Sequence, residues 1–302
     1  MDETTLRTLL DSALAGEPPI GPVADNALRA GIKVRRRRVL GAALSMAVAA
    51  AIAIVTPVVT GPLGDPPASG QHPSSMTGLT RPPNVPPPDK SVLRWPALAT
   101  DRTSIVKITG ETKTTSCGRI LEGSGFVISP QHVLTNAHVV AGVTRPHVHY
   151  GTSKVLPAKV VLFDSNTDVA ILYVPGLDAR PLRFAGRADP GSDAVIAGYP
   201  LAGRFRVVAA RVGSQRSATT PNIYQSGTVT RAIYAVRARV EPGNSGGPLL
   251  ASNGNVYGVI LAAPMNARDT GYALTASAVE PDVRHGAQAT APVSTHGCPQ
   301  PG

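Results

Sequence analysis

Short β-rich runs separated by turn residues dominate the chain from about Val92 onward, and this pattern constrains the fold more than any other feature. Gly, Pro, Asn and Asp separate the runs, and this region shows almost no helical periodicity. Many short strands at close spacing predict an all-β barrel or sandwich rather than alternating strands and helices. Only residues 276–283 suggest a short helix. The runs occupy residues 104–109, 123–129, 158–163, 168–174, 193–199, 206–214, 226–240, 255–263 and 270–276.

An uncharged apolar run precedes this region at residues 39–59. Its length of about 21 residues matches the ~20 residues that cross a hydrocarbon core as a helix. Lys33 and Arg35 to Arg38 lie directly before it, and the next positive charge after it is Arg81. The positive-inside rule therefore predicts a single-pass membrane protein, with residues 1–38 as a cytoplasmic tail and everything after about residue 60 outside the cytoplasm.

A cleaved signal peptide is the alternative reading of the same run, with cleavage near Ala68. The cationic cluster begins some 30 residues into the chain, and the apolar run exceeds the 7–15 residues of a signal-peptide core. Both features favour the uncleaved anchor. In the cytoplasmic tail, Leu6, Leu9, Leu10 and Leu14 recur at helical spacing and suggest a short amphipathic helix, whose partner the sequence does not identify.

Residues 60–96 are rich in Pro, Gly, Ser and Thr. Such a composition favours an extended spacer without a core, so we place the folded domain at residues 97–286 and a polar tail at residues 287–302. The formal net charge is +10, but aromatic residues make up only 4% of the chain and no basic and aromatic residues interleave. A basic surface and the membrane-flanking cluster explain the charge better than a nucleic-acid partner.

The segment Glu241-Pro-Gly-Asn-Ser-Gly-Gly-Pro-Leu249 carries the strongest chemical signal. A serine hydroxyl becomes a nucleophile when a base takes its proton and donors receive the charge on the attacked carbonyl. We expect Gly243 to let the backbone bend, so that its N–H and that of Ser245 form an oxyanion hole. An ordinary glycine-rich hairpin turn is the structural alternative.

Two upstream segments supply the partners that such a serine requires. Thr135-Asn-Ala-His-Val-Val140 places His138 at a strand end as a general base and acid. Thr167-Asp-Val-Ala-Ile-Leu172 places Asp168 before an apolar strand, where it would orient the imidazole. Asp164 is the nearby carboxylate that resembles it, but no apolar strand follows directly, so we expect its replacement to be mild.

The segments GSGFVIS, LTNAHVV, DVAIL and GNSGGPL resemble the signatures of trypsin-like (chymotrypsin-fold) serine proteases, especially the bacterial HtrA-like branch and actinobacterial membrane-tethered periplasmic proteases. The resemblance covers about residues 100–280. It implies two six-stranded β-barrels, with His138 and Asp168 on the first and Ser245 on the second. Asn244 replaces the aspartate that precedes the serine in trypsin, so activation by a new N-terminus is not expected, and about 20 residues after Ala278 leave no room for a PDZ domain.

The sequence indicates less about substrate specificity than about the reaction. By resemblance, Leu261, Ala262 and Ala263 form one wall of the primary specificity pocket, and Arg239 falls at the position of its floor. An arginine there either binds an acidic side chain or turns outward and leaves a small apolar pocket, which we favour. A basic substrate side chain is excluded.

Cys117 and Cys298 are the only two cysteines, too few for a four-ligand zinc site. Export permits a disulfide between them, and closing a loop of about 180 residues would stabilise the fold by ~4–5 kcal/mol less any strain. Two buried free thiols are the alternative. His147 and His149 share one face of a strand, but no third ligand lies close in sequence, so no metal or other cofactor is expected.

These features together predict a cell-membrane serine endopeptidase that acts on proteins or peptides of the cell envelope. A catalytically silent or regulated module that binds peptides in the same cleft is the alternative. The sequence names neither the physiological substrate, the activating signal nor the oligomeric state.

Overall fold

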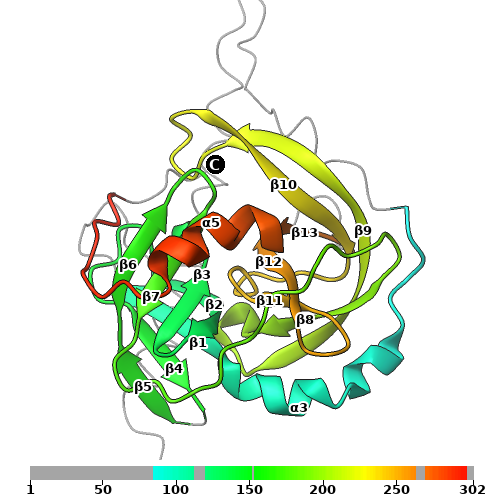
Figure 1. Ribbon diagram of the computed structural model, residues 1–302, viewed down its shortest axis with the longest axis horizontal. Coiled ribbons are helices and arrows are strands. Elements are labelled where there is room, and N and C mark those ends of the chain that lie inside the picture. Colours follow the sequence, from blue (N-terminus) through cyan, green and yellow to red (C-terminus); the bar gives the residue numbers. More distant parts are fainter. Residues whose placement is uncertain (1–83, 112–119, 152, 263–268, 298–302) are drawn as a thin grey trace, which may run out of the picture. The chain divides into compact units, whose positions relative to one another are not determined.

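A computed structural model describes residues 84–111, 120–151, 153–262 and 269–297 (Figure 1). The expected cytoplasmic tail, the apolar run 39–59 and both cysteines lie outside these ranges. Within the described ranges, no helix has the length and apolar character needed to cross a membrane.

The first part of the fold is an antiparallel sheet of seven strands in the order β5-β4-β1-β2-β3-β7-β6. Its strand order does not close, whereas we expected a six-stranded barrel. The strand that we expected at His147 and His149 is β4, whereas β5, most of whose residues are exposed, formed no run in the sequence. The strands are β1 (Ile105–Glu111), β2 (Ile120–Ser129), β3 (His132–Thr135), β4 (His147–Tyr150), β5 (Lys154–Pro157), β6 (Lys159–Asp164) and β7 (Val169–Tyr173).

The second part is a closed barrel of six strands in the order β10-β13-β12-β11-β8-β9, as expected from the resemblance. Its β9–β10 hairpin is long and extends toward the first sheet (Figure 1). The sequence did not reveal β11, a three-residue strand that directly follows the glycine-rich turn. The strands are β8 (Asp193–Gly198), β9 (Arg206–Pro221), β10 (Thr228–Arg237), β11 (Pro248–Leu250), β12 (Val256–Ala262) and β13 (Thr270–Thr275).

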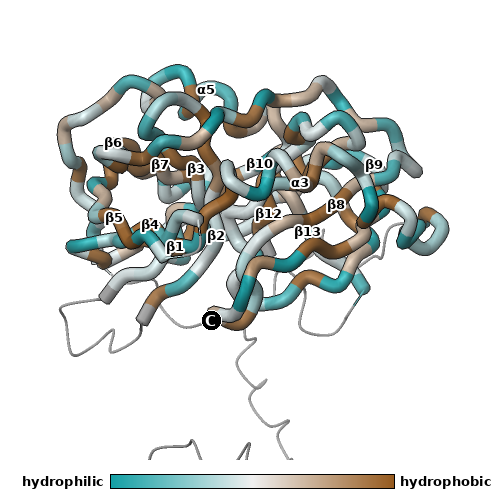
Figure 2. Tube along the Cα trace, turned by 90° about the horizontal axis from the view of Figure 1, so that it is seen from below, coloured by the Kyte–Doolittle hydropathy of each residue, from teal (hydrophilic) through white to brown (hydrophobic). Residues whose placement is uncertain are grey.

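Three hydrophobic clusters hold these parts together. One belongs to the first sheet, one to the barrel, and the third contains residues of both, for example Phe126 and Leu134 with Ile233 and Leu274. Figure 2 shows apolar positions concentrated along the central strands and polar positions along the outer loops. The shared cluster makes the sheet and the barrel one folded unit.

Short helices complete the fold. They are η1 (Lys90–Arg94), α3 (Ala97–Asp101), η2 (Arg102–Ser104), α4 (Ala137–Val140), η3 (Pro200–Ala202) and α5 (Ala276–Gly286). The expected C-terminal helix is α5. It is capped by the Thr275 hydroxyl, which accepts the N–H of Ala278 at 3.1 Å, and it buries Val279. In Figure 1 this helix crosses from the barrel to the first sheet.

Residues before and after the expected domain also pack on it. Arg237 donates to the carbonyl of Val85 at 2.9 Å, and Val92 in η1 is buried, so the described end of the expected spacer lies against the barrel. After α5, the N–H of Val293 donates to the carbonyl of Val160 at 2.9 Å. The described part of the tail therefore runs along the first sheet.

Candidate active site

His138 lies on α4, a single helical turn that directly follows β3. Ala137, Val139 and Val140 are buried in the core of the first sheet. The imidazole is the side chain of this turn that remains accessible, with 33% of it exposed. An apolar turn thus presents a histidine at the end of a strand, as the sequence predicted.

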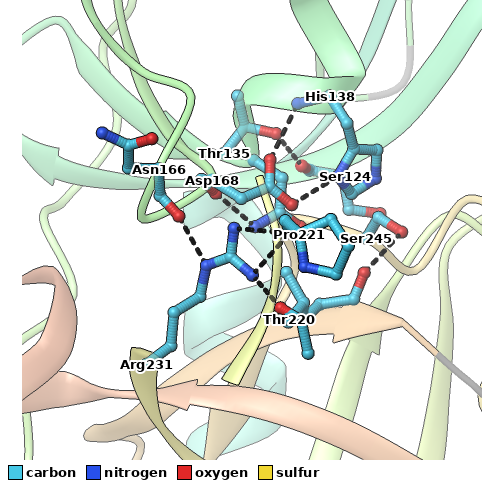
Figure 3. Close-up of polar contacts among 11 residues, drawn as sticks. Ser124, Thr135, His138, Asn166, Asp168, Thr220, Pro221, Arg231 and Ser245 are labelled. Carbon is cyan, nitrogen blue, oxygen red and sulfur yellow. Dashed lines mark hydrogen bonds and ion pairs between the residues drawn. The ribbon is translucent and has the colours of Figure 1, made fainter. Parts of the chain in front are cut away.

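Asp168 lies directly before β7 and is buried. One carboxylate oxygen, Oδ2, lies 2.7 Å from His138 Nδ1, and the other, Oδ1, accepts the backbone N–H of His138 at 2.9 Å (Figure 3). A carboxylate accepts only, so Nδ1 carries the proton of the pair and Nε2 is left as the basic nitrogen. This is the arrangement that a general base requires.

The pKa of His138 reflects this pair. Burial lowers it, but the negative charge of Asp168 and the hydrogen bond outweigh burial, and the net effect raises the pKa above its ordinary value of 6.5.

A left-handed backbone conformation, with φ +65°, places the Asp168 carboxylate under the imidazole. For a non-glycine residue this conformation costs about 1 kcal/mol or more and persists where its surroundings hold it. The N–H of Asp168 donates to the carbonyl of Asp164 at 3.0 Å, and Asn136 Nδ2 donates to the carbonyl of Asp168 at 2.9 Å.

Asp164 has more contacts with this turn than the sequence suggested. Its Oδ1 accepts the N–H groups of Asn166 at 2.7 Å and Thr167 at 3.1 Å, and its Oδ2 accepts the Thr167 hydroxyl at 2.6 Å. We had expected its replacement to be mild because no apolar strand follows it. The structure instead makes it the centre of the turn that ends at Asp168.

Ser245 comes from the barrel, in the turn between β10 and β11. The barrel residues approach the first sheet here, because the carbonyl of Ser245 accepts the N–H of Ser124 at 2.9 Å. The Ser245 hydroxyl donates to the carbonyl of Leu261 at 3.3 Å. A Cβ on Gly246 would lie 3.0 Å from the backbone nitrogen of Asn136, so the turn that bears Ser245 packs against the segment that leads to His138. The structure thus brings the three predicted residues together, with the hydroxyl turned toward β12.

The peptide bond before Gly243 has a defined orientation. Its carbonyl, on Pro242, accepts the N–H of Leu201 at 2.7 Å, so the N–H of Gly243 points the opposite way across a trans peptide. None of the hydrogen bonds that the described residues form with one another uses the N–H of Gly243 or of Ser245 as a donor. These are the two donors that we expected to form the oxyanion hole.

Glycine is required at position 243. Its φ is +92°, and a Cβ there would lie 2.5 Å from the carbonyl oxygen of Tyr199. Both the backbone conformation and the close approach exclude a side chain.

Ser124 supports this turn, and the sequence analysis did not single it out. Its buried hydroxyl donates to the carbonyl of Gly243 at 2.6 Å and accepts the N–H of Tyr199 at 2.9 Å. Its place between two glycines in GSGFVIS was the available signal, since small neighbours let another chain segment approach a strand closely.

The expected pocket residues are placed only in part. The Arg239 side chain is 77% exposed and pairs with Glu241 at 3.0 Å, so it does not form a buried pocket floor. Leu261 and Ala262 lie at the end of β12, and Leu261 adjoins Ser245 through its carbonyl. Ala263 lies outside the described residues.

The two strand histidines make no metal cluster. His149 Nε2 lies 2.9 Å from the Thr109 hydroxyl, and burial, with smaller contributions from Lys107 and His147, lowers the pKa of His149. Among the described residues, no group of three or more His, Cys, Asp or Glu side chains is arranged to hold a metal ion.

Comparison with known proteins agrees with this geometry. The trypsin-like peptidase domain family matches residues 123–259, a range that includes His138, Asp168 and Ser245. The chain is 42% identical over 230 residues to serine protease Rv3671c of Mycobacterium tuberculosis, which covers 75% of this chain and 57% of the relative. A crystal structure of the active form of the Rv3671c protease is 39% identical, with a TM-score of 0.69, and the match covers 80% of this chain and all of that one.

The chain belongs to the trypsin-like serine proteases. An HtrA-type protease, AlgW bound to a tripeptide, shares the fold at 24% identity, with a TM-score of 0.52 over 61% of this chain and 60% of that chain. The chain spans a little more than half the length of Rv3671c, so the match concerns the protease region of that relative.

Proposed function

We propose that the chain is a membrane-anchored, extracytoplasmic serine endopeptidase that hydrolyses peptide bonds through an acyl-enzyme at Ser245. The observation that carries the proposal is the 2.7 Å contact between His138 Nδ1 and Asp168 Oδ2, beside the turn that bears Ser245. Membership in the trypsin-like serine proteases supports the same reaction.

In the proposed reaction, Ser245 Oγ attacks the scissile carbonyl while His138 Nε2 accepts its proton. The carbonyl oxygen becomes negatively charged and binds the N–H groups of Gly243 and Ser245. His138 then donates the proton to the departing amine, which leaves an ester on Ser245, and a water molecule activated by His138 hydrolyses that ester. Asp168 stabilises the imidazolium throughout.

The hydroxyl of Ser245 must turn before it reacts. It now donates to Leu261 at 3.3 Å, and a change of its χ1 rotamer would direct it to the imidazole. Catalytic hydrogen bonds are often long or poorly aligned in enzymes without bound substrate. The same observation is what favours the alternative, a silent or regulated module that binds peptides without cleaving them.

For the primary pocket we propose a small apolar substrate side chain, because Arg239 is directed to solvent and pairs with Glu241. The substrates would be proteins or peptides of the cell envelope. This location rests on the basic residues before the apolar run 39–59, and relatives include a probable periplasmic endoprotease. A reporter fused at residue 95 that is active only in the cytoplasm would exclude the anchor.

The test of the function is labelling of the full-length protein by a fluorophosphonate, together with hydrolysis of labelled casein. We expect the unmodified protein to be labelled and active, and Ser245→Ala to lose both properties while keeping its fold. His138→Ala should cost about as much, because members of a triad act as a unit. Asp168→Asn should reduce the rate by roughly 10⁴.

Ser217→Ala, at an exposed serine on β9, is the matched control and should leave both properties unchanged. A folded, unlabelled protein would favour the silent module. Cleavage by Ser245→Ala would identify a different nucleophile. Alkylation of denatured protein would test the proposed Cys117–Cys298 disulfide, since two free thiols would exclude it.

A further inference from the structure

A buried arginine reaches from the barrel into the turn that carries Asp168. Arg231 lies on β10 and is 8% exposed. Its Nε donates to the carbonyl of Asn166 at 2.5 Å, and its Nη1 donates to the hydroxyl of Thr220 at 2.5 Å (Figure 3). Both Nη atoms also lie 3.4 Å from the carbonyl of Pro221. One guanidinium therefore joins the β9–β10 hairpin to the loop between β6 and β7.

This loop is held from two sides. From the first sheet, Asp164 binds the N–H groups that follow it, as described above. From the barrel, Arg231 binds the carbonyl of Asn166, and the N–H of Ile223 donates to the carbonyl of Ser165 at 3.3 Å. Asp168 comes two residues after Asn166, so the contacts from the barrel set the position of its backbone relative to Ser245.

Arg231 carries a positive charge although its side chain is buried. Moving a cation out of water is costly unless opposite charges compensate it. None of the ion pairs formed between described residues includes Arg231. Burial lowers the pKa of the guanidinium, and the carboxylates of Asp168 and Asp164 oppose that effect. The carboxylates of Asp168 and Asp164, at the two ends of this loop, therefore compensate the positive charge of Arg231.

We infer that Arg231 is a positioning residue that aligns Asp168, and through it His138, with the nucleophile on the barrel. The inference rests on the proposed triad and goes beyond it, because it assigns the alignment of the two halves of the site to one side chain. Because Asp168 raises the pKa of His138, the alignment that Arg231 maintains also affects that pKa.

Several other charged groups act in the same region and must stay constant in a test. Asp168 faces His138 directly, and Asp164 lies at the end of β6. Asp282 on α5 interacts with Asp164, and His285 interacts with Asp282. A change at Arg231 alone leaves all of these in place.

The test compares Arg231→Met and Arg231→Lys with the unmodified full-length protein. Methionine keeps the length and removes the charge, whereas lysine keeps the charge and loses the fork of donors. We expect Arg231→Met to lower kcat per labelled site by about tenfold to hundredfold with KM within about twofold, since misplacement affects the transition state more than binding. Its acid limb of kcat/KM should move to lower pH, because a misplaced Asp168 raises the His138 pKa less. Arg231→Lys should move kcat and the acid limb in the same direction but by less.

Arg211→Met is the matched control. Arg211 is also largely buried, at 16% side-chain exposure, and it pairs with Asp193 at 3.0 Å. It lies beside Arg237, about 20 Å along β10 from Arg231. This change should leave kcat per labelled site and the acid limb unchanged.

A second readout does not depend on activity. In a Ser245→Ala background, the imidazole protons of His138 are titrated by NMR with and without Arg231→Met. We expect the His138 pKa to fall when Arg231 is replaced, because the contact with Asp168 that raises it is weakened. An unchanged His138 pKa, or Arg231→Met that loses thermal stability but keeps kcat per labelled site, would overturn the inference. If the unmodified protein is inactive, the proposed function fails while the NMR titration still decides the role of Arg231.

Discussion

The N–H of Leu201 donates to the carbonyl of Pro242 at 2.7 Å, and this single bond orients the peptide that would stabilise the reaction intermediate. Leu201 and Ala202 both have positive φ, at +53° and +56°, and Lys107 Nζ holds the carbonyl of Ala202 at 2.6 Å. Backbone conformations of this kind cost free energy and are found where neighbouring contacts maintain them. The loop at η3 is thus strained in a way that fixes the orientation of Gly243.

Gly243→Ala should therefore abolish most acylation. The new Cβ would meet the carbonyl of Tyr199 at 2.5 Å, and the peptide would have to turn away from Leu201. Losing one oxyanion donor costs a factor of about 10² to 10³ in rate. The measurement is the rate of fluorophosphonate labelling.

Gly191→Ala provides the control for that change. Gly191 has nearly the same φ, +91°, but a Cβ there meets no atom within 4 Å. It should lose a little stability and keep its labelling rate. Equal losses at positions 191 and 243 would show that backbone strain, and not the oxyanion donor, explains the effect.

The pH dependence should follow His138. A general base works in its neutral form, and Asp168 raises the pKa of His138 above 6.5. We expect the acid limb of kcat/KM to lie above pH 6.5. In a Ser245→Ala background, Asp168→Asn should lower the His138 pKa, because burial then acts without the compensating charge. An NMR titration that finds the same pKa in both variants would contradict this electrostatic role.

Asp164→Ala should be damaging, because three hydrogen bonds to the turn would lose their acceptor. We expect stability to fall by about 2 kcal/mol, and kcat to fall by about tenfold or more. Asp164→Asn should be intermediate, since its amide oxygen still accepts the two N–H groups. Asp178→Ala, at an exposed residue in the loop after β7, should leave thermal unfolding and casein hydrolysis unchanged. A similar loss at Asp178 would contradict the special role of Asp164.

Asp282 should make stability depend on pH. Burial, and secondarily the charge of Asp164, raises the pKa of Asp282 from 3.8 to about 6. A raised carboxyl pKa means that the folded state binds the proton more tightly, so stability falls as pH rises from about 4 to about 6. Asp282→Asn should raise Tm at pH 7.5 but not at pH 4. Glu280→Gln, on the exposed face of α5, is the control. If the gain in Tm of Asp282→Asn at pH 7.5 persisted at pH 4, it would contradict the raised pKa of Asp282.

The three proposed catalytic residues could be singled out from the sequence because each lies in a local motif. His138 follows a strand, Asp168 precedes one, and Ser245 lies among glycines, so neighbours in sequence point to their proposed roles. The longer strands of the barrel were predictable because they form apolar runs, whereas the closed six-stranded arrangement was expected from the resemblance. The strand at His147 and His149 was anticipated and is β4, but β5 was missed, because it is fixed by pairing with β4.

The supporting residues were hidden because their partners are distant in sequence. Ser124 contacts Gly243, and Arg231 contacts Asn166. Neither contact produces a local sequence pattern. An arginine in a β-rich run is ordinarily expected at the surface, and only the fold shows that Arg231 is buried. Asp164 was undervalued because its importance comes from the turn geometry and not from the strand that follows.

The division of the site between the sheet and the barrel gives its assembly an order in time. His138 and Asp168 belong to the earlier part of the chain, whereas Ser245 and its neighbour Leu261 belong to the later part. Chains are made from the N-terminus and tend to fold in that order. A growing chain therefore carries the proposed base and carboxylate before the proposed nucleophile, and the hydroxyl meets them only after the barrel has closed and its shared core has formed with the sheet. If the chain is exported as proposed, its synthesis and export would precede assembly of the proposed triad.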